Sequence, residues 1–408
     1  MVLFLHNRYR ATGGEERVVE ELLALVREQL GEKAELLERD STELGKARAA
    51  AGLLRGGLGP RDVAKAVRLT GARVVHAHNL NPMFGWRALA AARAEGAKVV
   101  LHLHQYRLVC ATGVCFTAGQ ECTRCHGRNT LPGVIHNCRG NRSEALAYGA
   151  SLALWQRRLA DQADAVIVPS VFARERLREL GAPLDWERVH VLAPPVRMPG
   201  DGDGPASTVA FAEHGKADAP SAGPADVQAA STPGRVANGG YALVVSRLAP
   251  EKGIDVAIDA CRIAGAPLVV AGEGPELEAL RARAAGGDVR FAGRVDDGEL
   301  ERLRAGAALA IVPSRSAETF GMATAEAMAA GVPVVASRIG ALPELVEEPG
   351  LAEPGDPAAL AHAIKRLWGD AAAGERGRAR VREQCAPEVV ARGLQAVYGT
   401  NLFAGHRP

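Results

Sequence analysis

Two glutamates with seven residues between them mark the segment AETFGMATAEAMAAGVP as a candidate binding site. Glu318 is expected in a loop, and Glu326 inside the helix that follows it. The first N–H groups of a helix have no partner within the helix, so the turn at Phe320, Gly321 and Met322 could bind phosphate or sugar hydroxyls. Glycine also lets a ligand approach the backbone closely. The alternative is that the first glutamate only complements the helix dipole.

Two basic residues in the segment SRLAPEKG, Arg247 and Lys252, could bind the same anion. The guanidinium would act as a bidentate fork and the ammonium as a point charge. A solvated basic pair beside Glu251 would give the same sequence. A further strand-to-helix turn, AGEGPEL, contains Gly272 and Gly274 but lacks the third glycine of a dinucleotide-binding fingerprint, which disfavours a site for NAD.

Four histidines form two pairs in which the members are two residues apart. His76 and His78 lie at the end of one expected strand, and His102 and His104 lie at the end of another. Side chains two apart share one face of a strand, so each pair is expected to point toward a cleft at the strand ends. Histidines that cap a strand with satisfied hydrogen bonds are the alternative.

These residues need a scaffold that brings strand ends together. Short β-rich runs alternate with helical patterns along most of the 408 residues, which predicts parallel sheets with helices on both faces. Residues 200–240 are rich in Gly, Ala, Pro, Ser and Asp without periodicity, as in a flexible linker. We therefore expect an α/β protein of two doubly wound domains facing across a cleft, with ligands at the carboxyl ends of the strands. The expected strands are residues 2–5, 73–78, 98–104, 165–170 and 189–194, then 241–247, 267–272, 289–292, 308–314 and 333–337.

The charge and hydropathy of the sequence indicate which kinds of partner and which cellular location to expect. Lys and Arg number 49 and Asp and Glu number 47, and the net charge of +2 is too balanced to favour nucleic acid as a partner. No apolar run approaches the ~18 to 20 residues needed to span a bilayer, and the first run is shorter than the core of a signal peptide. The sequence predicts a cytoplasmic protein, soluble or peripheral at the inner face of the membrane.

In their order and spacing, these segments resemble the retaining nucleotide-sugar glycosyltransferases of family 4, which have the GT-B fold of two Rossmann-like domains. The resemblance spans nearly the whole chain. It implies an acceptor-binding domain at 1–199, with a cysteine-rich insertion at 105–142, and a donor-binding domain at 241–385. Residues 386–408 would form a helix that crosses back to the first domain. The linker at 200–240 is longer than such enzymes usually carry.

The resemblance also implies roles for single residues. Glu318 and Glu326 match the family's E-x7-E motif, in which the first glutamate contacts the donor sugar and the second the ribose. Arg247 and Lys252 match the residues that bind the donor diphosphate, and His104 is similar to the histidine of the catalytic cleft. The other donor-binding positions would be the glycine turn at Gly13 and Gly14, then Gly272, the turn at Phe320, Gly321 and Met322, and Phe291, Gly293, Arg294 and Val295 beside the nucleobase.

The implied reaction moves a sugar from a nucleoside diphosphate donor to an acceptor hydroxyl, with retention at the anomeric carbon, as in polysaccharide biosynthesis. The acceptor would be a glycan, a lipid-linked molecule or a small molecule. Arg247, Lys252 and helix N-termini could stabilise the departing diphosphate without a metal, so no cofactor is expected for catalysis. Two alternatives are a nucleotide-sugar epimerase of the same fold, and a non-catalytic protein that uses the cysteine-rich segment for interaction.

Five of the seven cysteines lie between residues 110 and 138. In a reducing compartment such a cluster favours a metal over disulfides, and four thiolates suit a closed, structural zinc site. Related family members carry a similar cysteine-containing insertion, which points to Cys110, Cys122, Cys125 and Cys138 as ligands, with Cys115 spare. Free buried cysteines or a redox pair are the alternatives.

The same region is basic, with five arginines against two glutamates from residue 102 to residue 144. A solvated loop surface would explain this excess. The second hypothesis is that Arg124, Arg128, Arg139 and Arg142 meet an anionic acceptor, such as a lipid-linked phosphate at the membrane surface.

Overall fold

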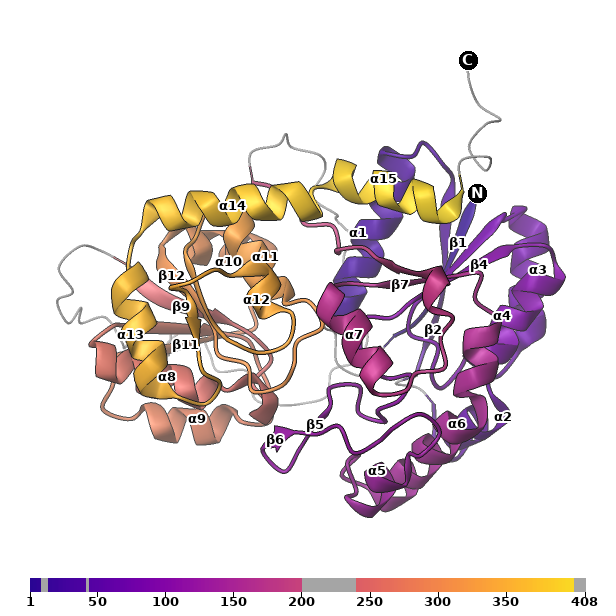
Figure 1. Ribbon diagram of the computed structural model, residues 1–408, viewed down its shortest axis with the longest axis horizontal. Helices are drawn as coiled ribbons and strands as arrows, with labels where there is room; N and C mark the ends of the chain where they lie inside the picture. Colours follow the sequence, from indigo (N-terminus) through magenta and orange to yellow (C-terminus); the bar gives the residue numbers. More distant parts are fainter. Residues whose placement is uncertain (9–13, 42–43, 200–239, 400–408) are drawn as a thin grey trace.

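Two six-stranded parallel sheets, each with helices on both faces, form two Rossmann-like domains that lie side by side (Figure 1). The computed structural model describes residues 1–8, 14–41, 44–199 and 240–399. The expected linker, apart from its last residue, lies outside these ranges. The predicted pair of doubly wound domains is confirmed.

The first sheet has the strand order β2-β1-β3-β4-β7-β8, and all neighbours are parallel. Its strands are β1 (Val2–Arg8), β2 (Ala34–Asp40), β3 (Val74–Ala77), β4 (Lys98–His102), β7 (Ala165–Val168) and β8 (Val189–Val191). The helices of this domain are α1 (Gly14–Glu28), α2 (Lys46–Arg55), α3 (Pro60–Thr70), α4 (Gly85–Ala94), α6 (Arg142–Asp161) and α7 (Val171–Glu179), with a 3₁₀ turn at Trp186–Arg188.

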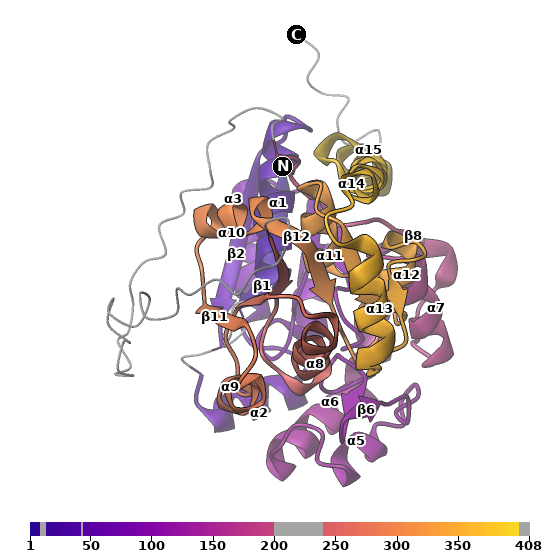
Figure 2. The same ribbon diagram turned by 90° about the vertical axis from the view of Figure 1, so that its left-hand side faces the viewer.

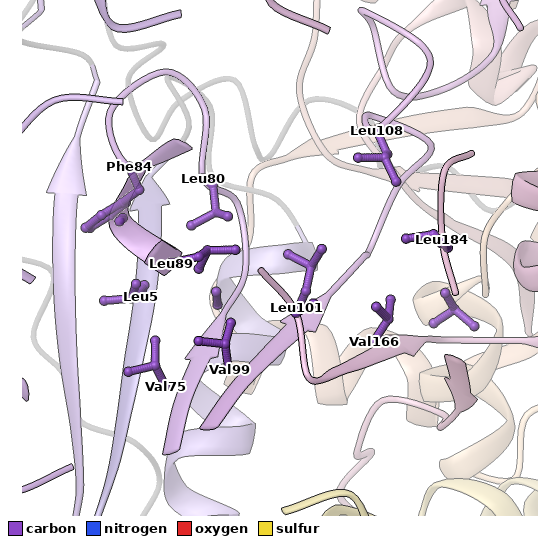
Figure 3. Packing of buried hydrophobic residues seen from close by; sticks show 14 of the residues in the cluster. Leu5, Val75, Leu80, Phe84, Leu89, Val99, Leu101, Leu108, Val166 and Leu184 are labelled. Carbon is purple, nitrogen blue, oxygen red and sulfur yellow. The ribbon is translucent and has the colours of Figure 1, made fainter. Parts of the chain in front are cut away.

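Alternate residues of the first sheet pack on its two faces. On one face, Leu5 and Val75 pack with Leu89 of α4 (Figure 3). On the other face, Phe4 packs with Leu22 of α1. Because helices bury both faces, the strands are nearly continuous apolar runs, which is why the sequence pattern indicates them.

The second sheet has the strand order β11-β10-β9-β12-β13-β14, again with parallel neighbours throughout. The order reverses between β9 and β12, and open sheets bind ligands outside the carboxyl ends of the strands at such a reversal. Its strands are β9 (Tyr241–Val245), β10 (Leu268–Ala271), β11 (Val289–Gly293), β12 (Ala307–Val312), β13 (Val334–Ser337) and β14 (Leu351–Ala352). The helices are α8 (Ile254–Ala264), α9 (Leu277–Ala284), α10 (Asp297–Ala305), α11 (Met322–Ala329), α12 (Leu342–Leu345) and α13 (Pro357–Leu367), with a 3₁₀ turn at Pro250–Lys252.

The cysteine-rich insertion between β4 and α6 folds through tight turns. It contains a hairpin of β5 (Phe116–Thr117) and β6 (Gln120–Glu121), and a short helix, α5 (Leu131–Ile135). Within the described ranges, all the non-glycine residues with positive φ lie here, and they are Cys115, Ala118 and Asn137 with φ of 50°, 51° and 47°.

Two helices connect the second domain back to the first. Helix α14 (Ala371–Cys385) packs on the second domain and α15 (Pro387–Tyr398) on the first (Figure 1). The two helices are seen nearly end-on, one behind the other, in Figure 2. Lys98 Nζ at the start of β4 donates to the carbonyls of Val397 and Tyr398, at 2.7 and 3.2 Å. In the part of the chain that the structure describes, no helix is long and apolar enough to cross a membrane.

Candidate functional site

A lysine and a glutamate meet at the reversal of the second sheet. Lys252 ends the turn that follows β9, and Glu318 lies in the loop between β12 and α11. Lys252 Nζ donates to Glu318 Oε1 at 2.7 Å, and Ser314 Oγ donates to the same oxygen at 2.6 Å. Arg247 in the same region is half-exposed and pairs with Glu251. The structure therefore brings together the two basic residues and the first glutamate of the motif.

The charge of Glu318 is maintained by its neighbours. Burial alone would raise the pKa of Glu318. The charge of Lys252, the hydrogen bonds from Lys252 and Ser314, and the charge of Arg247 together outweigh burial, so the pKa is lowered from its ordinary value. Glu318 is therefore an ionised hydrogen-bond acceptor at neutral pH.

Close packing of two loops holds the basic turn in place. Gly253 has a φ of 65°, and a Cβ there would lie 2.1 Å from the carbonyl oxygen of Pro313, so only glycine fits. The N–H groups of Arg315 and Ser316 donate to the carbonyl of Glu251, at 2.9 and 3.2 Å. The loop after β9 is thereby joined to the loop after β12.

The turn ahead of α11 offers its backbone to a ligand. Phe320 is buried in a hydrophobic cluster, and Met322 packs partly against that cluster. Gly321 precedes the helix with a φ of 99°, and a Cβ there would lie 2.6 Å from Leu342. A ligand at this turn would meet the N–H groups of the helix start, because the Phe320 side chain is packed away.

The second glutamate of the motif is paired with two arginines. Glu326 accepts a hydrogen bond from Arg304 of α10, and its Oε1 lies 3.7 Å from Nη1 of Arg17 in α1. The same Arg17 nitrogen lies 3.5 Å from Asp297. These ion pairs join the first domain to the second beside the position expected for the ribose.

His104 of the first domain meets the Glu318 loop of the second. Thr319 Oγ1 donates to the main-chain carbonyl of His104 at 2.7 Å, and Ser170 Oγ donates to the carbonyl of Thr319 at 2.7 Å. The Nε2 atom of His104 lies 2.8 Å from Nδ1 of His78. Burial lowers the pKa of His104, so the ring is neutral at neutral pH.

The other histidines continue from His104 as a buried stack. The rings of His102 and His104 stack with 4.2 Å between their centroids. His76 Nε2 lies 3.2 Å from His102 Nδ1, and His76 Nδ1 lies 2.7 Å from the hydroxyl of Tyr398 in α15. Burial lowers the pKa of His76 to about 3. The expectation that both pairs point to the cleft is wrong for His76, because α15 covers it.

Other expected donor-binding residues adjoin this site: a Cβ on Gly14 would lie 3.8 Å from the side chain of Met322, and the N–H of Gly272 donates to the carbonyl of Gly293 at 2.7 Å. Gly13 lies outside the described residues, and Gly14 begins α1. Gly272 packs so tightly that a Cβ there would lie 1.9 Å from the carbonyl oxygen of Ser246. The packing of the protein alone therefore requires glycine at this position, whether or not a ligand binds. After β11, Arg294 is exposed and Val295 is partly buried.

All five cysteines of the insertion line one pocket. Cys115, expected to be spare, is buried and hydrogen-bonded to Cys110. Among the described residues, the set of three side chains close enough to share one metal ion is His76, His78 and His102, and no three cysteine sulfurs lie that close. The structure thus gathers the cysteines around one space without placing them as a metal site.

Sequence reasoning missed the partners of both glutamates. Of these partners, Ser314 had the clearest sequence signal, because it ends the strand expected at 308–314, four residues before Glu318. Arg17 and Arg304 lie far from Glu326 in the sequence, so no local spacing could indicate them. Thr319 was adjacent to the motif, but its contact with the first domain has no sequence signal.

Comparisons with known proteins cover both domains. Residues 9–195 match the family model described as "Glycosyl transferase 4-like domain", and residues 239–370 match "Glycosyl transferases group 1". A GDP-mannose-dependent alpha-(1-6)-phosphatidylinositol dimannoside mannosyltransferase of Mycobacterium tuberculosis is 39% identical over 128 residues, which are 30% of this chain and 33% of that one. The chain therefore aligns with about a third of the length of this curated relative.

Solved structures resemble the fold over nearly the whole chain. HepE of Anabaena, solved in complex with UDP and glucose, has a TM-score of 0.57 and 19% identity, with 97% of this chain and 98% of that one covered. Sucrose-phosphate synthase of Thermosynechococcus elongatus has a TM-score of 0.63 and 20% identity, with 99% of each chain covered. The alternative of an epimerase is set aside, because the family models and these relatives are of glycosyltransferases. With one model on each domain, the chain belongs to the GT-B glycosyltransferases of family 4.

Proposed function

We propose that this chain transfers a sugar from a nucleoside diphosphate sugar to an acceptor hydroxyl. The observation that carries the proposal is the contact of Lys252 with Glu318 at the reversal of the second sheet, with Arg247 beside it. Two cations suit the diphosphate of such a donor, and an ionised carboxylate suits its sugar hydroxyls. HepE is solved with UDP and glucose, and the mycobacterial relative is named as GDP-mannose-dependent, which supports a donor of this class.

Arg247 and Lys252 would stabilise the diphosphate as its bond to the anomeric carbon breaks. Negative charge grows on the leaving oxygen while the sugar becomes oxocarbenium-like. Cations held in place beforehand, together with the N-terminus of α11, lower the energy of that charge. Glu318 holds Lys252 in position and accepts hydrogen bonds from the sugar. These groups supply the stabilisation without a catalytic metal.

Retention would follow from a front-face reaction. The acceptor oxygen bonds to the anomeric carbon on the face from which the phosphate oxygen leaves, and the acceptor proton passes to that departing oxygen. Glu318 Oε1 accepts hydrogen bonds from Lys252 and Ser314. A carboxylate held in this way is suited to binding the sugar. Retaining glycosidases differ, because one of their two carboxylates is a covalent nucleophile. The neutral ring of His104 would contact the sugar from the first domain.

The acceptor would approach from the first domain, and the basic insertion supports an anionic group on it. Arg128 donates to the carbonyl of Ala153 at 2.9 Å, and Arg139 lies 3.5 Å from Glu144, so these two serve the fold. Arg124 and Arg142 are exposed and would meet a phosphate, as in a lipid-linked intermediate of polysaccharide biosynthesis at a membrane surface.

We also propose a structural zinc ion on Cys110, Cys122, Cys125 and Cys138. Support comes from their gathering around one pocket and from the CxxC spacing of two of them. Elemental analysis of protein purified without chelator should find one zinc per chain, retained in Cys115→Ser and lost in Cys125→Ser. Wild-type protein without zinc would end this proposal.

The experiment that tests the transferase is nucleoside diphosphate release from a panel of nucleotide sugars, with and without lipid and glycan acceptors. Release from one donor, abolished in Lys252→Ala, would support the proposal and identify the donor. A nucleotide that raises the melting temperature without release would indicate a missing acceptor, because ligand binding stabilises the folded state. No release and no thermal shift would favour a non-catalytic protein.

A further inference from the structure

The ring of His104 meets the ring of a second histidine edge to edge. His78 directly follows β3 and His104 follows β4, and these two strands are parallel neighbours in the first sheet. His78 Nδ1 lies 2.8 Å from His104 Nε2, and the ring centroids lie 5.1 Å apart with 16° between the ring planes. Two ring nitrogens in this arrangement share one proton in an N–H···N hydrogen bond. One of the two rings is therefore the donor and the other the acceptor.

His78 is buried, and its second ring nitrogen is unpaired. The residue is 3% exposed, and its Nε2 atom has no hydrogen-bond partner among the residues that the structure describes. Burial, and then the neighbouring histidines, lower the pKa of His78 well below its ordinary value. The ring is therefore neutral at neutral pH and carries a single proton, either on Nδ1 or on Nε2.

The burial of Nε2 decides which nitrogen of His78 carries this proton. Buried N–H groups without a partner are rare in proteins, and unpaired acceptors are less so. The proton of His78 therefore lies on Nδ1, and His78 donates to Nε2 of His104. His104 is neutral as well, because burial lowers its pKa. With its Nε2 accepting, the single proton of His104 lies on Nδ1.

A second pair of histidines holds the first pair in place. His76 Nε2 lies 3.2 Å from His102 Nδ1, and both residues are buried. The ring of His102 stacks on that of His104 with 4.2 Å between the centroids, and the centroids of His76 and His78 lie 4.5 Å apart. His76 also contacts the hydroxyl of Tyr398 in α15. A rotation of the His104 ring would thus break both its stacking and its hydrogen bond.

His104 is the member of this group that a ligand can reach. Its residue is partly exposed, whereas the other three histidines are buried. Its main-chain carbonyl accepts the hydrogen bond from Thr319, which is adjacent to Glu318. Because His78 occupies Nε2, Nδ1 is the ring nitrogen left for a ligand. An Nδ1–H group donates to a hydroxyl oxygen of a sugar, whereas a bare Nδ1 could only accept from one.

We propose that His78 is a positioning residue for the transfer reaction. It donates from Nδ1 to His104 Nε2, which fixes the orientation of the His104 ring and keeps its proton on Nδ1. From there His104 donates to a hydroxyl oxygen of the donor sugar. This inference rests on the proposed function for the ligand of His104, whereas the state of the two rings does not depend on it.

The first test is the position of the proton on His104, measured on the ligand-free chain with ¹⁵N-labelled histidine. Long-range ¹H–¹⁵N NMR correlations distinguish a neutral ring protonated on Nδ1 from one protonated on Nε2. The His104 signals are those that disappear in His104→Gln. We expect the proton on Nδ1, and a wild-type ring with its proton on Nε2 overturns the inference.

The same spectra show whether His78 is the donor. In His78→Leu the Nε2 signal of His104 should shift downfield, because a ring nitrogen that accepts a hydrogen bond is shielded. An Nε2 signal that His78→Leu leaves unshifted overturns the inference. The wild-type spectrum does not need this variant, so the position of the proton is tested even if His78→Leu does not fold.

A matched set of variants measures the consequence for transfer. His78→Leu should lower kcat/KM for the donor roughly 2- to 12-fold, the range for one lost neutral hydrogen bond. His78→Asn should restore most of that loss, because its amide nitrogen is bonded to Cγ, as Nδ1 of histidine is. His190→Leu is the control and should keep the wild-type value, because His190 of β8 is exposed and lies outside both pairs.

A double-mutant cycle shows whether His78 acts through His104. His104→Ala should lower kcat/KM by a similar factor, and adding His78→Leu should lower it little further, because substitutions that remove the same interaction are not additive. A second loss as large as the first would mean that His78 acts independently of His104, which overturns the positioning role. A wild-type kcat/KM in His78→Leu overturns it as well.

The spectra and the kinetics separate this inference from the proposed function. If no nucleotide sugar is turned over, the proposed function fails, and the spectra alone decide whether His78 positions His104. If a donor is turned over but the wild-type proton of His104 lies on Nε2, the transferase stands and the inference is overturned.

Discussion

Arg247 and Lys252 are the side chains on which turnover should depend most. Removing one donor that stabilises a developing oxyanion typically costs ~10²- to 10³-fold in kcat. We expect Arg247→Ala and Lys252→Ala to lower kcat by that order, measured at saturating donor. Arg262→Ala is the matched control, because Arg262 is an exposed arginine of α8 outside the site. A rate near that of the wild type in either site variant would contradict the assignment.

The charge of Glu318 makes a pH-dependent contribution to stability. Its pKa in the folded protein is lowered from the ordinary 4.5, so the ionised form stabilises the fold above about pH 4.5. That contribution is lost as the pH falls through the lowered folded-state pKa. We expect Glu318→Gln to be less stable than the wild type at pH 7, with the difference shrinking below pH 4.5. Urea unfolding at several pH values would measure it, and a difference independent of pH would refute it.

Helix α15 is the element that ties the end of the described chain to the first domain. Leu394 is fully buried there among residues of α1 and β1. Leu394→Ala should lower the free energy of unfolding by roughly 2 to 5 kcal/mol, because it removes buried methyl groups and leaves a cavity. The exposed Arg392→Ala on the same helix should change it little. Denaturant midpoints of the two variants give the comparison, and equal midpoints would mean that α15 is not packed as described.

At the scale of the whole molecule, Arg17 connects the two domains through Glu326. It lies 3.7 Å from the carboxylate that is proposed to bind the ribose, so arginine and ribose compete for one group. Arg17 is 40% exposed, and exposed ion pairs contribute at most about 1 kcal/mol.

Arg17→Gln should therefore raise the affinity for UDP or GDP by no more than about fivefold, with a smaller effect at high salt. Glu326→Ala should lower the affinity. Calorimetric titration of both variants with UDP or GDP, at two salt concentrations, checks both predictions. A loss of affinity in Arg17→Gln as large as in Glu326→Ala would show that Arg17 itself binds the nucleotide.

The sequence by itself determined the fold class and the order of the site segments. Helices cover both faces of each sheet, so the strands are apolar runs that local composition indicates. Glu318 and Glu326 share one loop and the helix that follows it, and Arg247 and Lys252 share another loop. The spacing of these residues along the chain is therefore enough to predict that the members of each pair belong to one segment of the site. These features are local, and local pattern is what a single sequence encodes.

Only the tertiary structure decided which groups act on those residues. The contact of Thr319 with His104 joins residues 215 apart in the chain, and that of His76 with Tyr398 joins residues 322 apart. Arg17 reaches Glu326 from the other domain. Periodicity shows that a side chain lies on a buried face, but it does not show which distant element covers that face. For that reason the burial of His76 and the arginines on Glu326 emerged only when the sheets, the two domains and α15 were assembled.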